Sequence, residues 1–312
     1  MRIAIVSDIH ANLAAFEAVL VHARNLGYDR MICLGDVVGY GPDPVECVDL
    51  VRELCAFTLL GNHDYASVYE PTRFNPVARK AAFWTRDQVF RTLDASGIAA
   101  ERTRLAERQA AGEFGPETHA ILDKHLADAK GRMDFMFRIS PRQILDDRYI
   151  CVHGSPSSPV NEYLFKDDPE SNSYRLERNF KLLTLTGDDG RDRRTSALVG
   201  HTHTPGFILE ESDGVFEWVG VPRGLESWTP SEAEMPPGLR YILNPGSVGQ
   251  PRDEDPRASY ATLELTGDPA TDRFTFHRVP YDIARTQERI YALGRAGAPL
   301  DSWLAERLAL GQ

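Results

Sequence analysis

The sequence predicts an α/β fold, and three observations carry that prediction. The first sixty residues alternate between short apolar runs and amphipathic segments, in the order strand, helix, strand, helix, strand. Each of these apolar runs ends directly in a cluster of His, Asp or Asn side chains. Strand-like runs return after a long helical stretch, so strands are expected in both halves of the 312-residue chain.

The N-terminal elements follow from hydrophobic periodicity. Leu13, Phe16 and Leu20 fall on one face of a helix that Gly27 brings to an end. The elements expected in this part are a strand over residues 2–7, a helix over 12–26, a strand over 30–34, a helix over 44–54 and a strand over 56–60. Such an order is typical of a parallel sheet covered by helices.

Residues 66–130 have a helical pattern, with helices expected over 76–93 and 116–129 and a polar Arg/Glu-rich segment between them. We interpret this stretch as an insertion in a single domain that spans residues 1–312, because it separates polar clusters that must converge. Two interpretations of its aromatic residues stay open. They form a cap over the substrate, or they pack on the core.

The second half is expected to be richer in strands. A polar turn is expected over residues 188–192, a hairpin turning at Asp213-Gly214, and a Pro- and Glu-rich loop over 222–238. The remaining expected elements are strands over 135–139, 143–145, 149–153, 197–199, 241–243, 259–265 and 273–279, a helix over 174–185, and C-terminal helices over 281–310.

Composition and charge narrow the class of protein. With 42% hydrophobic and 26% charged residues, the chain resembles an ordinary globular protein. Its formal net charge is −11, and no run of Lys or Arg forms a stripe that could follow a phosphate backbone. A polymeric nucleic-acid substrate is therefore disfavoured.

The chain is expected to be cytoplasmic, with no membrane partner. The apolar run at residues 3–6 is too short for a secretory signal, and no window approaches the roughly 20 apolar residues of a membrane span. The four cysteines lack CxxC spacing, so they indicate neither a disulfide framework nor a thiolate zinc site.

Five polar clusters, each directly after an expected strand, contain the same types of metal-binding residue, namely His, Asp and Asn. In open α/β sheets, ligands collect at the carboxyl ends of the strands, so these clusters can meet in one crevice. Imidazole and carboxylate suit manganese, zinc, iron or nickel, and an Asp can bridge two such ions. The clusters are Asp8-Ile9-His10, Gly35-Asp36, Gly61-Asn62-His63-Asp64, His153-Gly154 and Gly200-His201-Thr202-His203.

Taken singly, each cluster also has an ordinary structural explanation. Asp8 could cap the first helix, and Asn62-His63-Asp64 could be a polar turn. The other histidines are expected to be ordinary surface imidazoles with hydrogen-bond partners, and among them are His22, His119, His125 and His277. The order and placement of the five clusters together favour a site for two divalent cations, which would lie roughly 3.5–4 Å apart and activate a water for attack at phosphorus.

With these motifs the chain resembles the calcineurin-like metallophosphoesterase superfamily, whose five signatures occur in order between residues 8 and 203. Two further stretches are similar to its compact bacterial phosphodiesterase branch: Ser7 to Asn12, and the run from Asn244 through Pro245-Gly246-Ser247 to Arg252. We accordingly expect a four-layer α/β/β/α sandwich of two mixed β-sheets, with the metal pair at the strand ends.

The resemblance implies a role for each site residue. One ion would be held by Asp8, His10, Asp36 and His203, and the other by Asp36, Asn62, His153 and His201, with a bridging hydroxide as the nucleophile. Manganese is the preferred ion, with iron, zinc or nickel as alternatives. His63 would stabilise the developing charge or protonate the leaving oxygen. Asp64 either orients a ring as an outer partner or closes a turn.

A departure from related branches bears on the substrate. In the protein-phosphatase-like and diadenosine-tetraphosphatase-like branches an Arg follows the Gly-Asp cluster, whereas residues 35–42 here contain none. Arg252 could replace it as a phosphate clamp or be a surface charge. We predict hydrolysis of a small phosphodiester, such as a cyclic nucleotide or a dinucleotide polyphosphate. The alternatives are a phosphomonoesterase or protein phosphatase, and a catalytically silent metal-binding scaffold. The oligomeric state is left open.

Overall fold

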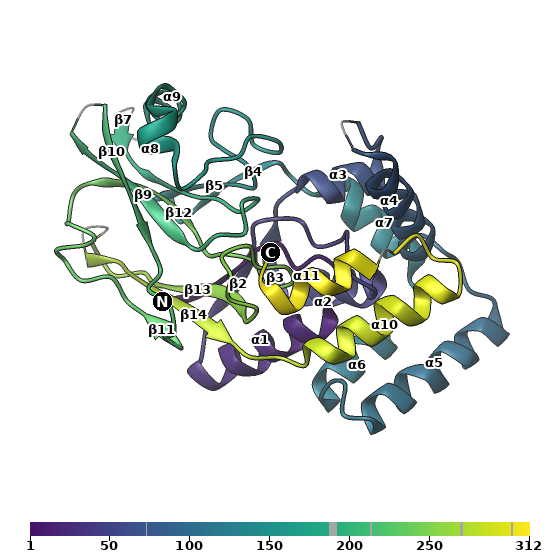
Figure 1. Cartoon of the computed structure of the whole chain (residues 1–312). Coiled ribbons are helices and arrows are strands. Elements are labelled where there is room, and N and C mark those ends of the chain that lie inside the picture. Colours follow the sequence, from purple (N-terminus) through teal and green to yellow (C-terminus); the bar gives the residue numbers. More distant parts are fainter. Residues whose placement is uncertain (73, 187–191, 213, 269–270, 301) are drawn as a thin grey trace.

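Two six-stranded sheets face each other, and helices cover both outer faces (Figure 1). The computed structural model describes residues 1–72, 74–186, 192–212, 214–268, 271–300 and 302–312. Both sheets are mixed, so the expectation of an α/β sandwich with two mixed sheets is confirmed.

The first sheet has a parallel half and an antiparallel half. Strands β1, β2 and β3 run parallel, so their carboxyl ends meet at one edge. β13 pairs antiparallel with β1, and β14 and β11 extend the sheet. In spatial order the strands are β11 (Ser227–Trp228), β14 (Arg273–Val279), β13 (Ala258–Glu264), β1 (Arg2–Val6), β2 (Arg30–Cys33) and β3 (Cys55–Thr58).

The second sheet also has three parallel strands, but they lie in its middle. β5, β8 and β12 run parallel, and antiparallel strands flank them on both sides. In spatial order the strands are β10 (Val215–Gly220), β9 (Gly206–Ser212), β12 (Arg240–Asn244), β8 (Ser196–Leu198), β5 (Tyr149–Val152) and β4 (Arg142–Leu145). A separate two-stranded sheet is formed by β6 (Thr184–Thr186) and β7 (Asp192–Arg194).

Apolar side chains from the facing sides of the sheets form a shared core. Ile5 and Ile32 of the first sheet meet Leu198, Phe207 and Leu243 of the second, and all five are buried. Outside the first sheet lie α1 (Leu13–Leu26) and α2 (Pro44–Leu54), and outside the second lie α8 (Asp168–Ser171) and α9 (Ser173–Lys181). These helices complete the four layers.

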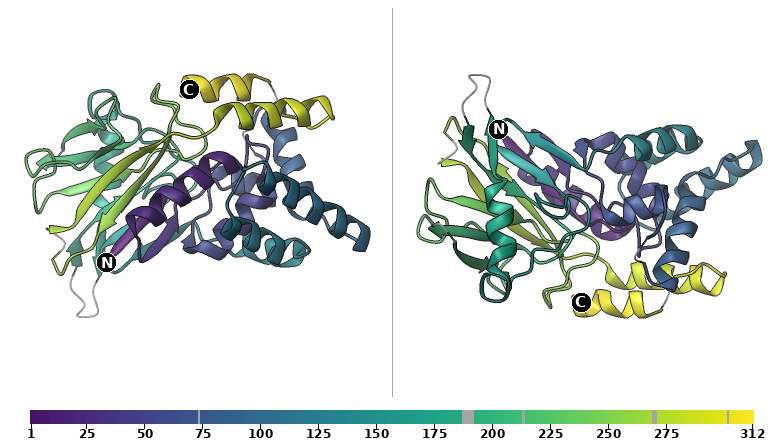
Figure 2. Two further views of the ribbon diagram at one scale, coloured as in Figure 1. Left: turned by 90° about the horizontal axis from the view of Figure 1, so that it is seen from below. Right: turned by 90° about the horizontal axis from the view of Figure 1, so that it is seen from above.

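Five helices follow β3 in the chain. They are α3 (Asn62–Val68), α4 (Pro76–Val89), α5 (Ala95–Ala110), α6 (Pro116–His125) and α7 (Ala129–Arg138). Leu105, Leu122 and Met136 of these helices belong to the same buried cluster as residues of α1 and α2. In Figure 2, α5 extends away from the two sheets.

Two expectations for this part of the chain are wrong. The polar segment after residue 93 is the helix α5, which Asp94 caps by accepting a hydrogen bond from the Gly97 amide at 2.8 Å. The strand expected over residues 135–139 is the last turn of α7, whose cap is Asp128. A short apolar run does not distinguish a strand from a helix end, which explains this error.

In the second half, β9 and β10 form the expected hairpin, and the short strand β11 lies within the expected loop over 222–238. Residues 188–191 of the expected polar turn and Asp213 of the hairpin turn lie outside the described residues.

The C-terminal helices α10 (Ile283–Arg295) and α11 (Ser302–Leu310) pack on their own chain. Ile290, Leu300 and Leu308 form a small buried cluster against which Trp84 of α4 packs. Among the described helices, none is both long and apolar enough to cross a membrane.

Candidate metal centre

The loops that follow β1, β2, β3, β5 and β8 bring the five polar clusters to one place between the sheets. Residues with the chemistry of metal ligands therefore come from both sheets, and each lies one to five residues beyond the end of its strand. Asp8, His10, Asp36, His153 and His203 are each at most 1% exposed. A buried cluster of carboxylates and imidazoles has to be compensated by charge or hydrogen bonds to be stable.

The backbone at these positions is strained. Left-handed backbone costs a residue with a side chain roughly 1–2 kcal/mol, and it clusters at functional sites. Backbone hydrogen bonds hold two of the strained residues in place, from the Asp8 amide to the Gly35 carbonyl at 2.9 Å and from the His10 amide to the Asp36 carbonyl at 3.0 Å. The φ angles are 53° at Asp8, 50° at His10, 52° at Asp36, 69° at His201 and 61° at His203.

One group of possible ligands consists of Asp8, His10, Asp36 and His203, whose donor atoms all lie within 4.8 Å of one another. His203 Nε2 is 3.1 Å from Asp8 Oδ1. His10 Nε2 is 3.7 Å from Asp36 Oδ2 and 3.0 Å from His203 Nε2. Two carboxylates and two imidazoles converging in this way could hold one divalent cation.

A second group consists of Asp36, His153 and His201. His153 Nε2 lies 3.3 Å from Asp36 Oδ2 and 3.1 Å from His201 Nδ1. Asp36 therefore belongs to both groups, as a bridging carboxylate between two cations must.

Backbone carbonyls orient three of the imidazoles. When Nδ1–H donates to a carbonyl, the lone pair of Nε2 is directed at the centre of the cluster. The Nδ1 contacts are His10 to the Val38 carbonyl at 3.2 Å, His153 to the Leu34 carbonyl at 3.0 Å and His203 to the Gln250 carbonyl at 2.6 Å.

Without a bound cation, the charges of the carboxylates and imidazoles in the cluster compensate one another. Burial would raise the pKa of Asp36, but protonated His153 outweighs it and holds that pKa well below its ordinary value. Burial would lower the pKa of His153, but Asp36 raises it to about 9. Burial lowers the pKa of His10 and of His203, so both rings are neutral and able to bind a cation.

The donor set fits divalent metal ions. Asn62 Oδ1 is buried and has no hydrogen-bond partner among the described residues. The backbone amide of the next residue, His63, donates to Asp36 Oδ1 at 2.9 Å, which places Asn62 beside the shared carboxylate. A buried amide oxygen without a partner costs free energy unless a cation or a water satisfies it. Imidazole, carboxylate and amide ligands suit manganese, iron, zinc or nickel.

His63 lies over the cluster. Its ring centroid is 5.0 Å from that of His10 and 4.4 Å from that of Tyr40. Burial, together with the charge of Arg252, lowers the pKa of His63 to about 4 despite the opposite effect of Asp36. His63 is therefore a neutral imidazole near pH 7.

Asp64 and Arg252 occupy different places around the cluster. The Asp64 carboxylate accepts hydrogen bonds from the backbone amides of Gly61 at 3.1 Å and Val38 at 3.2 Å, so it joins the loops after β2 and β3. The Arg252 amide donates to the His203 carbonyl at 3.3 Å, and its guanidinium lies 5.9 Å from the centre of the Tyr40 ring. Arg252 therefore lies beside the proposed metal ligands and not on a distant part of the surface.

The stretch from Asn244 to Gln250 has a role that the motif did not reveal. Asn244 Nδ2 donates to the Gly200 carbonyl at 2.7 Å, and Ser247 Oγ donates to the Asp8 carbonyl at 2.8 Å. This loop therefore holds together the ligand loops of the two sheets. The motif was visible in the sequence, but its contacts join positions more than 40 and more than 230 residues apart.

Sequence reasoning missed the aromatic side chain that covers the second group. The Tyr163 ring stacks on His201 with centroids 3.6 Å apart and an interplanar angle of 20°. Its neighbour Glu162 accepts hydrogen bonds from Ser155 Oγ at 2.5 Å and Ser157 Oγ at 2.6 Å, which fixes this loop. No periodicity or cluster marks Tyr163, because it lies ten residues beyond the expected ligand at the end of β5.

The histidines expected to be ordinary have partners elsewhere. His22 contacts the Tyr260 hydroxyl at 2.8 Å, and His277 contacts the Thr262 hydroxyl at 3.0 Å. His125 pairs with Glu53 at 2.9 Å, and the His119 ring is 6.4 Å from that of Phe114.

A sandwich of two mixed sheets with a His/Asp cluster at the strand ends defines a metal-dependent hydrolase class, and the comparisons agree. The family model for calcineurin-like phosphoesterases matches residues 1–228, and the chain belongs to this family. It is accordingly a metallophosphoesterase, a hydrolase of phosphate esters, and the resemblance stated from the motifs is confirmed.

Three similar proteins illustrate the range of the family. The chain is 35% identical to a metallophosphoesterase from Sphaerobacter thermophilus, with a TM-score of 0.68 over 100% of this chain and 99% of that one. It is 30% identical to the uncharacterized protein MJ0912 of Methanocaldococcus jannaschii, over 99% of this chain and 98% of that protein. The phosphoesterase YfcE from E. coli is 18% identical, with a TM-score of 0.36 over 85% of this chain and 88% of that one.

Replacing the shared carboxylate tests the geometry of the centre. We expect Asp36→Asn to lose metal and to lower kcat at least about 100-fold, because both groups of ligands lose one charged oxygen. Metal content by mass spectrometry and the rate of ester hydrolysis are the measurements. Asp146→Asn, which alters an exposed pair with Arg30, is the control and should keep both. Full metal content and rate in Asp36→Asn would contradict a bridging role.

Proposed function

We propose that the protein hydrolyses a small phosphodiester, such as a cyclic nucleotide or a dinucleotide polyphosphate, with the help of two divalent cations. The observation that carries this proposal is the pair of ligand groups that share Asp36. The proposed ligands are Asp8, His10, Asp36 and His203 for one ion, and Asp36, Asn62, His153 and His201 for the other. Manganese is the ion we prefer, with iron, zinc or nickel as alternatives.

When bound, such cations would lower the pKa of a water and neutralise charge on the phosphoryl oxygens. The protein's own contribution is to hold the reacting groups in line and to exclude water. The strained loops and the backbone carbonyls behind the imidazoles fix the ligands before a substrate arrives, so little reorganisation is needed.

Arg252 is suited to bind a phosphoryl oxygen. Its Nη2 donates to Gln250 Oε1 at 3.0 Å, while its buried Nε has no hydrogen-bond partner among the described residues. A guanidinium with an unused donor at the edge of a metal centre is a ready partner for phosphate. A diester carries one negative charge, whereas a monoester carries about 1.5 to 2 near pH 7, so a single guanidinium matches the diester better.

His63 is proposed to act on the leaving oxygen. Because its pKa lies near 4, the ring is neutral and has one N–H to donate. A neutral imidazole can stabilise charge on the departing oxygen by a hydrogen bond without itself adding a positive charge to the site. Gly39 leaves the room for this ring, since a Cβ there would lie 2.4 Å from His63 Nδ1.

Aromatic rings around the centre favour a substrate with a flat group. Phe74 belongs to the insertion whose aromatic residues could form a cap or pack on the core, and its ring centroid lies 5.0 Å from that of His63. Near His201, the Tyr163 ring stacks on that of Phe165 with centroids 5.3 Å apart, nearly parallel. A nucleobase can stack on an aromatic ring such as that of Phe74. We therefore propose that residues 66–130 act as a cap through Phe74, while their other helices close the core.

The choice between diester and monoester is open to a direct comparison. With manganese added, we expect kcat/KM for bis-p-nitrophenyl phosphate to exceed that for p-nitrophenyl phosphate by about tenfold or more. Both esters release the same chromophore, so absorbance at one wavelength measures both. A clear preference for the monoester would reverse the ranking in favour of a phosphomonoesterase, and no turnover of either ester with full metal content would favour a silent scaffold.

The role of His63 predicts a loss of rate without a loss of metal. His63→Asn should lower kcat by roughly 10²–10⁴-fold, because a donor to the leaving oxygen is removed. Metal content, measured in parallel, should equal that of the unaltered protein. The loss should shrink for esters with better leaving groups, which need less help. A uniform loss for all esters would argue for a structural role instead.

The cap interpretation predicts a change in selectivity. Phe74→Ala should raise KM for a dinucleotide substrate by about tenfold or more and leave KM for bis-p-nitrophenyl phosphate within about twofold, because only the former offers a base to stack. Steady-state kinetics on both esters is the measurement. Phe83→Ala, which alters a ring on α4 next to Arg79 and Arg86, serves as the control. Equal KM changes for both esters would contradict the cap.

A further inference from the structure

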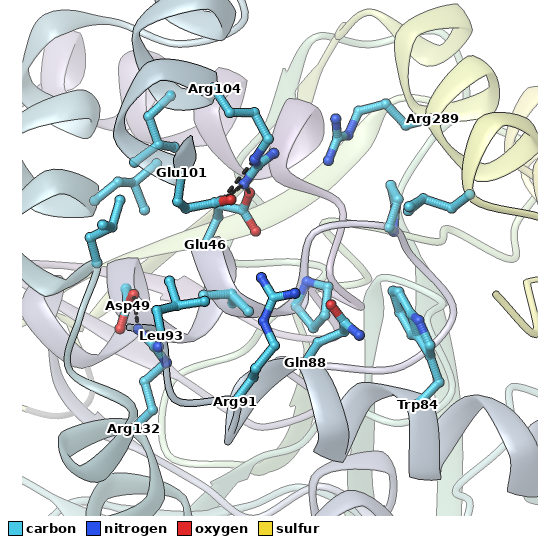
Figure 3. A pocket seen from close by; sticks show the side chains of 17 residues that line it. Glu46, Asp49, Trp84, Gln88, Arg91, Leu93, Glu101, Arg104, Arg132 and Arg289 are labelled. Atoms are coloured by element: carbon cyan, nitrogen blue, oxygen red, sulfur yellow. Dashed lines mark hydrogen bonds and ion pairs between the residues drawn. The ribbon is translucent and has the colours of Figure 1, made fainter. Parts of the chain in front are cut away.

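A second pocket is lined by residues of α2, α4, α5 and α10 (Figure 3). It encloses about 280 Å³, close to the lower end of the roughly 300–1,000 Å³ range of small-molecule sites. The lining includes none of the metal ligands proposed above. Pro42 and Pro44 form part of its wall, so the chain passes directly from the metal centre to this pocket.

Three side chains at the end of α4 point into the pocket. Trp84 and Gln88 lie one turn apart on the same face of α4, and Arg91 follows just after the helix ends (Figure 3). The Arg91 guanidinium is exposed and forms no ion pair or hydrogen bond within the described part of the chain. An indole, an amide and a free guanidinium thus offer a stacking face, a polar edge and a positive charge.

The acidic residues of the pocket are already neutralised. Glu46 accepts hydrogen bonds from Arg104 at 2.8 Å and from Arg108 at 2.5 Å. Asp49 pairs with the buried Arg132 at 2.9 Å. The third acid of the lining, Glu101, is bonded to Arg104.

What remains without compensation in the pocket is positive charge. Within the described ranges Arg91 has no partner, whereas Arg289 pairs with Asp43 through Nη2. The N-terminus of α2, at Pro44 and Val45, also borders the pocket and adds the positive end of an eleven-residue helix. The pocket is therefore suited to an anion.

We propose that this pocket binds a small aromatic anion of the nucleoside monophosphate class. Its base would stack on Trp84 and bond to Gln88, and its phosphate would meet Arg91, with the Arg289 guanidinium adding positive charge to the wall. Leu105, Leu122 and Leu293 also line the pocket, and an apolar wall of this kind favours an organic anion over inorganic phosphate alone. This site stands apart from the proposed phosphodiesterase function and does not depend on it.

Binding of AMP to protein freed of metal by a chelator tests the proposal. Quenching of tryptophan fluorescence and calorimetry should both report binding of AMP, and inorganic phosphate should bind about tenfold more weakly or worse. Arg91→Ala and Gln88→Ala should each weaken AMP about tenfold or more, and Trp84→Phe should keep binding but lose the quenching. Arg138→Ala, an exposed arginine outside the pocket, should bind AMP like the unaltered protein.

Three results would overturn the proposal. The first is no binding of AMP at concentrations up to about 10 mM, and the second is equal binding by Arg91→Ala and the unaltered protein. The third is displacement of AMP by metal loading of the first centre, which would place it there. Circular dichroism and thermal unfolding of Arg91→Ala, compared with the unaltered protein, show whether the variant is folded and keep this test independent of the proposed function.

Discussion

The buried carboxylate of Asp36 is the constraint on which the centre depends. An ionised carboxylate that is 1% exposed is tolerated only if donors and positive charges surround it. The His63 amide and protonated His153 supply these in the protein alone, and a pair of cations would take over that role. The approach is so close that a Cβ at Gly61 would lie 2.0 Å from Asp36 Oδ1. The loops after β2 and β3 therefore fit together only with glycine at that position.

Both sheets contain three neighbouring parallel strands, and this arrangement suits the convergence on Asp36. Parallel strands bring several carboxyl ends to one edge, and here the two edges face each other so that Asp8 and Asp36 of one sheet meet His153 and His203 of the other. Left-handed backbone at the ligands turns their side chains inward, and the loop from Asn244 to Gln250 holds the edges in register. The strained backbone of the sandwich therefore lies where the proposed ligands converge.

The sequence alone could predict those site residues that a local pattern of neighbouring residues marks. Asp8, Asp36 and His153 each follow an apolar run, and that pattern needs no knowledge of distant residues. Tyr163 over His201, the clamp by Asn244 and the neutralisation of Glu46 by Arg104 and Arg108 all depend on contacts between remote segments, which periodicity does not report. The same limit explains the helix α5, whose charged residues resemble a linker until their partners on α2 are known.

The loop from Gly39 to Asp43 contacts both the metal centre and the helical segment, although the two lie apart in the chain. Tyr40 packs against His10 and His63 at one end, while Asp43 at the other end accepts hydrogen bonds from Arg108 of α5 and Arg289 of α10. Gly39 and Tyr40 both have positive φ, and α2 begins at Pro44 directly after the loop. One short loop therefore connects Tyr40, beside the proposed metal ligands, to the carboxylate that pairs with the arginines of α5 and α10.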